Sequence, residues 1–239
     1  MQGQSKLDAY TINARYKPAL IVALPIFLAV LAWFPNGIKG LSVITGLLTW
    51  AGGTALLAQI GRDQGKKKEP GLYADWGGQP SIRMLRHRDA PNKVIMARRH
   101  SKLQGLIKDI KIPTEQDEKE DPAGADRVYD ACCAFLRANT RDKKKFPLIA
   151  QENMNYGFRR NLWGMRPFGV GMSLIGIALV GLSIITFVAE KTPVPRTVVV
   201  AGILNGILLI LWLAWFNKGW VKIAADAYAE RLLESCEKL

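Results

Sequence analysis

The side chains of this sequence that could do chemistry are mostly basic, and they lie in clusters. Arginine carries a fork of N–H donors that suits bidentate recognition of phosphate, and lysine adds a compact positive charge. The clusters furthest from any apolar run predict a binding site for an anionic cytosolic ligand. The predicted ligand-binding residues are Arg83, Arg86, Arg88, Arg98, Arg99, Lys102, Lys143, Lys144 and Lys145.

Catalytic chemistry is not indicated by any motif. The sequence contains no GxSxG, HExxH or Walker A motif, and no dinucleotide fingerprint after a strand. Its histidines are His87 and His100, and neither has a carboxylate or thiol at ligand spacing, so no metal site is predicted. Glu152 is a lone carboxylate among basic residues, which favours a structural salt-bridge partner. We therefore predict a protein that is not an enzyme and uses no cofactor.

Apolar runs free of Asp, Glu, Lys and Arg predict four membrane spans, at about 19–34, 41–60, 168–188 and 197–216. At about 1.5 Å per residue, the last three can each cross a hydrocarbon core of about 30 Å. The first is shorter, so we expect it to include residues 16–18 and to kink at Pro25. A signal peptide is the alternative for this run, but residues 33–36 provide no cleavage site. Buried helices of a soluble protein are the alternative for all four, but uncharged runs of this length are typical of membrane proteins.

The expected fold is an all-α membrane protein in which two transmembrane hairpins flank a helical cytoplasmic domain. The expected divisions are 1–60 for an N-terminal segment and the first hairpin, 61–167 for the basic helical domain, 168–216 for the second hairpin and 217–239 for a C-terminal helix. The formal net charge is +13, and the basic residues beside the spans predict that both termini and the central domain are cytoplasmic. The three cysteines would then be reduced, and their spacing matches no zinc site.

The central domain shows signals for at least two helices in its first half. Pro80 suits the first turn of a helix that we expect to run to about Arg88, and Asn92 can cap the next helix. On that next helix, Arg98, Arg99 and Lys102 are expected to share one cationic, solvent-facing side.

The second half of this domain has a different pattern. Residues 112–122 are rich in Glu, Asp and Pro and predict an exposed acidic loop. Apolar periodicity predicts an amphipathic helix over 123–139. After Phe216, apolar residues in helical register predict that the fourth span continues as a helix into the cytoplasm. We expect no strand.

Small residues in the spans predict close helix packing. Gly202 and Gly206 form a GxxxG motif, which allows two backbones to approach, within one subunit or between subunits. Asn205 lies inside the motif, and an amide within a membrane needs a partner or a wet cavity. It is therefore a tie between helices or a group facing a pore.

The segment 143–168 joins the basic domain to the third span, so we expect it to couple the two as a lever. Tyr156, Arg159 and Arg160 are the predicted coupling residues. The alternative for the arginines near the membrane, including Arg166, is that they determine topology and contact lipid headgroups.

A resemblance covers the order of elements along most of the chain. At WGGQPSIRMLRHRD and FPLIAQENMNYGFRRNLWGMRP, the sequence resembles small multi-span membrane effector subunits of bacterial antiphage defence systems that are paired with nucleotidyltransferases, of the Hailong type or the SMODS- and SLOG-associated types. The resemblance implies a homo-oligomeric channel in the bacterial inner membrane that is opened by a nucleotide or short oligonucleotide, with a cognate nucleotidyltransferase as partner. Some of these proteins have only two spans, so the second pair departs from their pattern.

The expected function is therefore an oligomeric inner-membrane channel or membrane-disrupting effector in antiphage defence, gated by an anionic signal that its cytoplasmic domain binds. The alternative is a non-conducting membrane scaffold that docks a cytoplasmic partner through its basic surface. A small-solute transporter would need broken or charged helices, which the spans lack.

Overall fold

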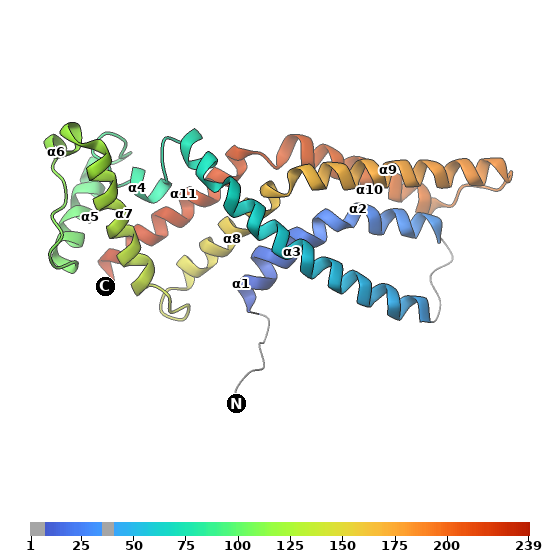
Figure 1. Ribbon diagram of the computed structural model, residues 1–239, viewed down its shortest axis with the longest axis horizontal. Coiled ribbons are helices and arrows are strands. Elements are labelled where there is room, and N and C mark those ends of the chain that lie inside the picture. The colour runs from blue at the N-terminus through green and yellow to red at the C-terminus, as the bar shows by residue number, and fades with distance from the viewer. Residues whose placement is uncertain (1–7, 35–40) are drawn as a thin grey trace, which may run out of the picture. The chain divides into compact units, whose positions relative to one another are not determined.

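A computed structural model describes residues 8–34 and 41–239, without the side chains of residues 41–51 (Figure 1). This part of the chain is helical and contains no strand, as expected. It has eleven α-helices and three tighter or wider helical turns. They are α1 (Ala9–Thr11), the π-helical η1 (Ile12–Tyr16), α2 (Lys17–Trp33), α3 (Leu41–Asp75), α4 (Pro80–Arg83), α5 (Lys93–Leu106), α6 (Glu115–Glu120), α7 (Pro122–Asn139), α8 (Pro147–Gly164), α9 (Arg166–Ala189), α10 (Arg196–Ile210), the π-helical η2 (Leu211–Trp215), α11 (Lys218–Glu234) and the 3₁₀ turn η3 (Ser235–Glu237).

The chain divides into two compact units. Unit 1 comprises residues Met1–Lys68 and Gly157–Val221, and unit 2 comprises Glu69–Tyr156 and Lys222–Leu239. Each unit is therefore built from segments that are distant in sequence.

Unit 1 contains three helices that are long and apolar enough to cross a membrane. They are Ala9–Trp33, Arg166–Ala189 and Arg196–Trp215, of 25, 24 and 20 residues. At about 1.5 Å per residue, each reaches the thickness of a hydrocarbon core. The outward side chains on these helices, such as Ile185, Ile210 and Leu213, are exposed and apolar, as lipid contact requires. By length and composition, these helices of the described chain are therefore three candidate membrane spans.

The expected second span, residues 41–60, falls within α3. The side chains of residues 41–51 and the connector at 35–40 lie outside the described residues. Four spans arranged as two hairpins thus stay a prediction.

Within unit 1, α2, α9 and α10 lie side by side (Figure 1). Their core contains Val22, Leu208 and Trp212, and alanines allow the helices to approach one another. Trp33 Nε1 donates to Leu179 O at 3.0 Å, and Ser183 Oγ donates to Ala32 O at 3.2 Å. These two hydrogen bonds join α2 to α9. In a membrane they satisfy polar side-chain groups that lipid tails could not satisfy.

The first part of α3 and the end of α8 also belong to unit 1, and they approach closely at two glycines. A Cβ atom on Gly164 would lie 2.6 Å from Gly65 N, and one on Gly65 would lie 2.5 Å from Asn161 Oδ1. Only glycine permits this separation, because any side chain would overlap the facing backbone.

Unit 2 is a helical domain with its own core. Leu85, Leu103, Tyr129, Leu136 and Leu232 are fully buried and come from four separate segments. The three cysteines, Cys132, Cys133 and Cys236, are buried in the same core. The expected amphipathic helix over 123–139 is confirmed as α7, and it supplies half of the buried residues described for this core.

The capping prediction for α5 is also confirmed. The Asn92 side chain accepts hydrogen bonds from Val94 N and Ile95 N, at 3.0 and 3.1 Å. Two of the first four N–H groups of the helix, which have no partner inside it, are thereby satisfied.

Four local expectations were wrong. The helix at Pro80 ends at Arg83 rather than near Arg88, because His87 N and Arg88 N donate to Glu118. The supposed acidic loop contains α6, which begins with a capping box between Thr114 and Asp117.

The other two concern α5 and the C-terminal region. Arg99 is buried with Met96 and Leu103 instead of sharing a solvent face with Arg98. The chain also leaves the helical conformation at Phe216, where ψ is 73°, so α11 is a separate helix rather than a continuation of the last span.

Candidate functional site

The Arg86 guanidinium lies at the centre of an ion-pair network in unit 2. Its Nε and Nη2 donate to the two carboxylate oxygens of Asp126 at 2.8 and 2.6 Å. Its Nη1 donates to Asp89 Oδ2 at 2.8 Å and to Gly77 O at 2.6 Å. Burial opposes the charge, but the hydrogen bonds with Asp126 and Asp89 outweigh it and raise the pKa of Arg86. Arg86, which is 7% exposed, thus binds the protein's own carboxylates.

The Glu118 carboxylate organises the adjoining part of this network. It accepts hydrogen bonds from His87 N at 2.7 Å, from Arg88 Nη1 at 2.8 Å and from Tyr129 Oη at 2.9 Å. Burial alone would raise the pKa of Glu118, but these donors and the positive charge of Arg88 lower it. Arg88 also contacts Asp126, so Arg86 and Arg88 meet on one carboxylate.

The other predicted ligand residues are distributed over unit 2. Arg98 pairs with Glu237 near the C-terminus, Arg99 is buried, and Lys102 is exposed. Lys143, Lys144 and Lys145 lie on the exposed turn between α7 and α8, where Asp142 accepts hydrogen bonds from the backbone N–H groups of the last two.

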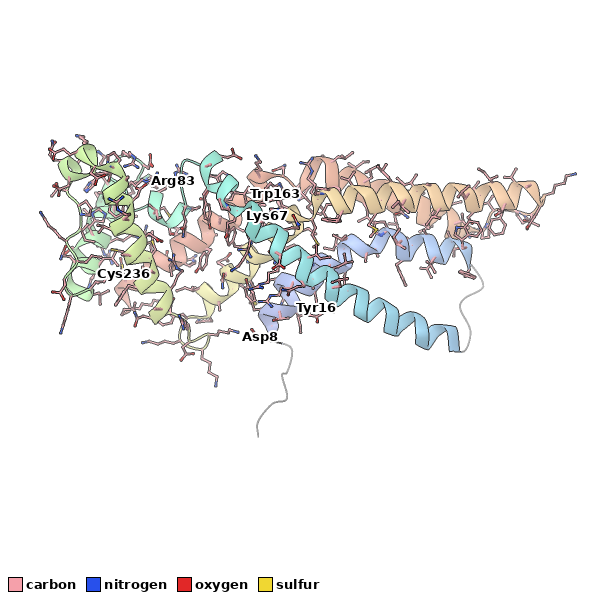
Figure 2. All side chains as sticks on the ribbon, in the orientation of Figure 1. Asp8, Tyr16, Lys67, Arg83, Trp163 and Cys236 are labelled. Atoms are coloured by element: carbon pink, nitrogen blue, oxygen red, sulfur yellow. The ribbon has the colours of Figure 1, made fainter. Side chains whose placement is uncertain are left out.

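Arg83 differs from Arg86 and Arg88 because its side chain makes no hydrogen bond or ion pair with another described residue, and it lines a pocket. The pocket has a volume of about 250 Å³ and is also lined by Pro80, Met84, Asp89, Lys222 and Asp226. Figure 2 labels Arg83 on the ribbon at the end of α4. Lys222 donates to Asp226, and Asp89 pairs with Arg86. The lining therefore carries two positive and two negative groups, which suits a ligand with both anionic and donor groups better than a polyanion.

The sequence did not indicate Lys222 and Asp226 as pocket residues. They lie about 140 positions after Arg83, on α11, and only folding brings them to it. Their four-residue spacing on a helix signals an ion pair and carries no information about a pocket.

Tyr156, one of the predicted coupling residues, is buried in unit 2. Its hydroxyl donates to Glu69 Oε1 at 2.6 Å and lies 3.3 Å from Tyr73 Oη, and its ring stacks on Tyr228. Burial, followed by the nearby Tyr73 and Glu69, raises the pKa of Tyr156, so the phenol stays protonated.

Arg159 and Arg160 belong to unit 1 and are held by neighbouring groups. Arg159 Nη1 donates to Trp220 O at 2.9 Å, and its guanidinium lies 4.9 Å from the centroid of the Trp220 ring. Arg160 is buried and donates to Asn161 Oδ1, and Asn161 in turn donates to Ala14 O. Whether they couple the units stays a prediction.

The three residues predicted for helix packing or a pore have different surroundings. A Cβ on Gly202 would lie 3.4 Å from Val180, whereas a Cβ on Gly206 would meet no described atom within 4 Å. Asn205 is fully buried; its Nδ2 donates to Ala201 O in its own helix, and its Oδ1 has no hydrogen-bond partner among the residues that the structure describes.

Grouped His, Cys, Asp and Glu side chains that could hold a metal ion are absent from the described residues. Comparison of the chain with family models, with curated proteins and with solved structures finds no match.

Proposed function

We propose that this chain is a subunit of an oligomeric membrane channel or membrane-disrupting assembly that opens when unit 2 binds an anionic nucleotide or short oligonucleotide. The resemblance in sequence would imply antiphage defence at the bacterial inner membrane, with a nucleotidyltransferase as the source of the signal, and this part of the proposal rests on the resemblance alone.

The observation that carries the proposal is the polar interior of unit 1. Asn205 Oδ1 on α10 and Ser173 Oγ on α9 are fully buried and have no hydrogen-bond partner among the described residues. Asn205 Oδ1 faces Gly176, which lies three residues after Ser173 on the same helix. An unpartnered amide in an apolar surrounding costs free energy, so these buried groups would gain water as a partner if the helices separated on opening.

The amide of Asn205 also bears on its two predicted roles. A tie between helices would require a hydrogen bond to another helix, but the donor of Asn205 binds its own helix. The geometry thus gives no hydrogen bond for a tie, and we propose that the buried Oδ1 meets water only when the assembly opens.

Arg83 is the residue that we assign to the first contact with the signal, because its guanidinium donors have no partner in the described part of the chain and it lines a pocket. Arg86 and Arg88 both contact Asp89, which lines the pocket, at 2.8 and 4.0 Å. The mixed charge of the lining favours a ligand in which a phosphate is accompanied by a base or sugar that can hydrogen-bond to carboxylates.

The test is potassium efflux from liposomes that contain the purified protein, measured with no addition, with ATP and with a tri-adenylate. The wild-type chain should release potassium with at least one of these two probes. Arg83→Ala should remove the response to the probe, and Asn205→Leu should lower efflux at least tenfold. Ile203→Leu, on the exposed face of the same helix, is the matched control and should behave like the wild type.

A non-conducting scaffold is the second candidate, and one observation favours it. Val94 and Ile95, at the start of α5, are 79% and 44% exposed, which is unusual for adjacent apolar side chains and suits a protein partner. Absence of potassium efflux in all three conditions, from liposomes in which the protein is folded, would reject the channel and leave the scaffold.

A further inference from the structure

A second pocket lies within unit 1, and its charge is entirely positive. It has a volume of about 470 Å³ and is lined by Lys68, Trp163, Arg166, Pro167, Asn217 and Lys218. Its described lining contains three basic side chains and no carboxylate, unlike the balanced lining of the Arg83 pocket. Figure 2 labels Trp163, which comes from the last turn of α8.

Arg166 is fixed in this pocket by the end of the neighbouring span. Its Nε donates to Trp212 O at 2.8 Å and its Nη2 donates to Leu213 O at 2.7 Å. Both carbonyl groups belong to the π-helical turn η2, near the helix end where carbonyls lack partners within the helix. A guanidinium carries five N–H donors, so Arg166 keeps donors for a further acceptor.

Lys68, which also lines the pocket, is held by α8. Its ammonium group donates to Gly164 O at 2.7 Å and lies 5.7 Å from the centroid of the Trp163 ring. The close approach of Gly65 to Gly164 places the two helices near enough for this contact. Burial lowers the pKa of Lys68, because removal from water disfavours the charged ammonium.

Neither Lys68 nor Arg166 forms an ion pair with a carboxylate in the part of the chain that the structure describes. Both cations line the same pocket and are held by neutral carbonyls, so an anion bound in the pocket would be attracted by both. Arg166 begins one candidate span and Asn217 follows the end of another, so the pocket lies where these two apolar helices end. Lipid phosphates are found at this depth.

We propose that this pocket binds a phosphate group, and that in the membrane the group is the phosphodiester of an anionic phospholipid, held by Lys68, Arg166 and Lys218. The guanidinium supplies directed hydrogen bonds, the two ammonium groups supply charge, and Trp163 is an aromatic residue of the kind that is enriched at the membrane surface. The site is separate from the Arg83 pocket and does not depend on the proposed channel.

The experiment measures lipid binding by the purified full chain, using native mass spectrometry and the shift of its thermal unfolding midpoint in detergent. The probes are a short-chain phosphatidylglycerol, a phosphatidylcholine with the same chains, and inorganic phosphate. The variant is Lys68→Gln/Lys218→Gln. The control is Lys66→Gln/Lys67→Gln, which removes the same charge from exposed positions of α3.

We expect one tightly retained phosphatidylglycerol per chain, with an affinity that falls at least tenfold in the pocket variant and less than twofold in the control. The affinity should also fall as salt rises, because the attraction is electrostatic. Preference for phosphatidylglycerol over both other probes identifies the lipid as the source. Equal stabilisation by inorganic phosphate identifies a soluble phosphate compound instead and rejects the lipid assignment.

Two results would overturn the site itself. One is an equal loss of affinity in the two double variants, which would mean that general surface charge attracts the lipid. The other is retention of no phosphatidylglycerol and no phosphate by the wild-type chain. If the pocket variant does not fold, Lys218→Gln alone is compared with Lys67→Gln, and a smaller loss of the same kind is expected.

Discussion

Tyr129 of α7 donates a 2.9 Å hydrogen bond to Glu118 of α6, and both side chains are buried inside unit 2. The carboxylate also accepts hydrogen bonds from the backbone of His87 and from Arg88. Replacement of Glu118 by alanine would leave these donors without an acceptor and would leave the Arg88 guanidinium without this carboxylate partner. Unit 2 therefore depends on one carboxylate to hold α6, α7 and the segment after α4 together.

We predict that Glu118→Ala destabilises the protein by about 3 kcal/mol, the usual cost of breaking a buried, hydrogen-bonded ion pair. Chemical unfolding followed by circular dichroism in detergent measures the change. Glu115→Ala is the matched control on the same helix, because Glu115 is exposed and pairs only with Lys119. Its loss should cost less than about 0.5 kcal/mol, and similar costs for the two variants would contradict the role of Glu118.

The pH dependence of stability should report on His100. This side chain is buried, donates from Nε2 to Leu85 O at 2.7 Å, and packs against the rings of His87 and Tyr129. Burial lowers the pKa of His100 below its ordinary value of 6.5, so the unfolded chain takes up a proton that the folded chain does not. Stability should therefore fall as the pH drops from about 7 to about 5.

The variant His100→Gln tests this expectation, because glutamine can still donate to Leu85 O but does not titrate in this range. Its unfolding midpoint should change less than that of the wild type between pH 7.5 and 5.5, and the two proteins should respond alike above about pH 7.5. If the unfolding midpoints of the two proteins changed in parallel over the whole pH range, a group other than His100 would cause the loss of stability at low pH.

Gly176 should tolerate no side chain. A Cβ there would lie 2.5 Å from Asn205 Oδ1 and 2.9 Å from Pro25 O, and the latter is backbone that cannot rotate away. We predict that Gly176→Ala destabilises unit 1 by about 2 kcal/mol through overpacking. Resistance to unfolding by sodium dodecyl sulfate measures this. Gly171→Ala, on the same helix with no described atom within 4 Å, should be at least as stable as the wild type.

A substitution at Gly206 distinguishes packing within one chain from packing between chains. Because a Cβ at this position meets nothing within 4 Å, Gly206→Leu should leave the stability of one chain unchanged. If the GxxxG motif packs against another copy, the same change should lower the mass of the particle measured by light scattering in detergent. Gly181→Leu is the control at another open glycine, and it should keep the mass of the wild type.

Topology is tested with reporters in exposed positions. One is fused after Leu239, and the other is inserted between Lys108 and Asp109, on the exposed turn after α5. Both should report the cytoplasm, as the basic residues beside the spans predict. A signal from the opposite side at either position would overturn the orientation.

The sequence allowed the long helices to be predicted, because apolar runs and helical periodicity are local signals. The periodicity around Cys132 and Leu136 predicted α7, and Asn92 predicted the start of α5. The segment containing α6 was interpreted as a loop from its acidic composition, although Thr114 and Asp117 stand at the spacing of a capping box.

The roles of the arginines could not be predicted in this way. A sequence shows that Arg86 is basic, but the carboxylate that neutralises it, on Asp126, lies 40 residues away. Ion pairs between residues this far apart in sequence decide which basic side chains keep donors for a ligand. For the same reason, Lys68, Trp163 and Lys218 show no common pattern before folding brings them to one pocket.

The burial of all three cysteines has a practical consequence for labelling experiments. Burial raises the pKa of Cys132 to about 12 and that of Cys133 to about 11, and Cys236 shifts in the same direction. Thiolate is the reactive form, so the folded protein should react slowly with maleimides at neutral pH. A fluorophore can then be attached to one introduced surface cysteine without removing the native ones. The rate at which the native thiols react then measures how often unit 2 opens transiently.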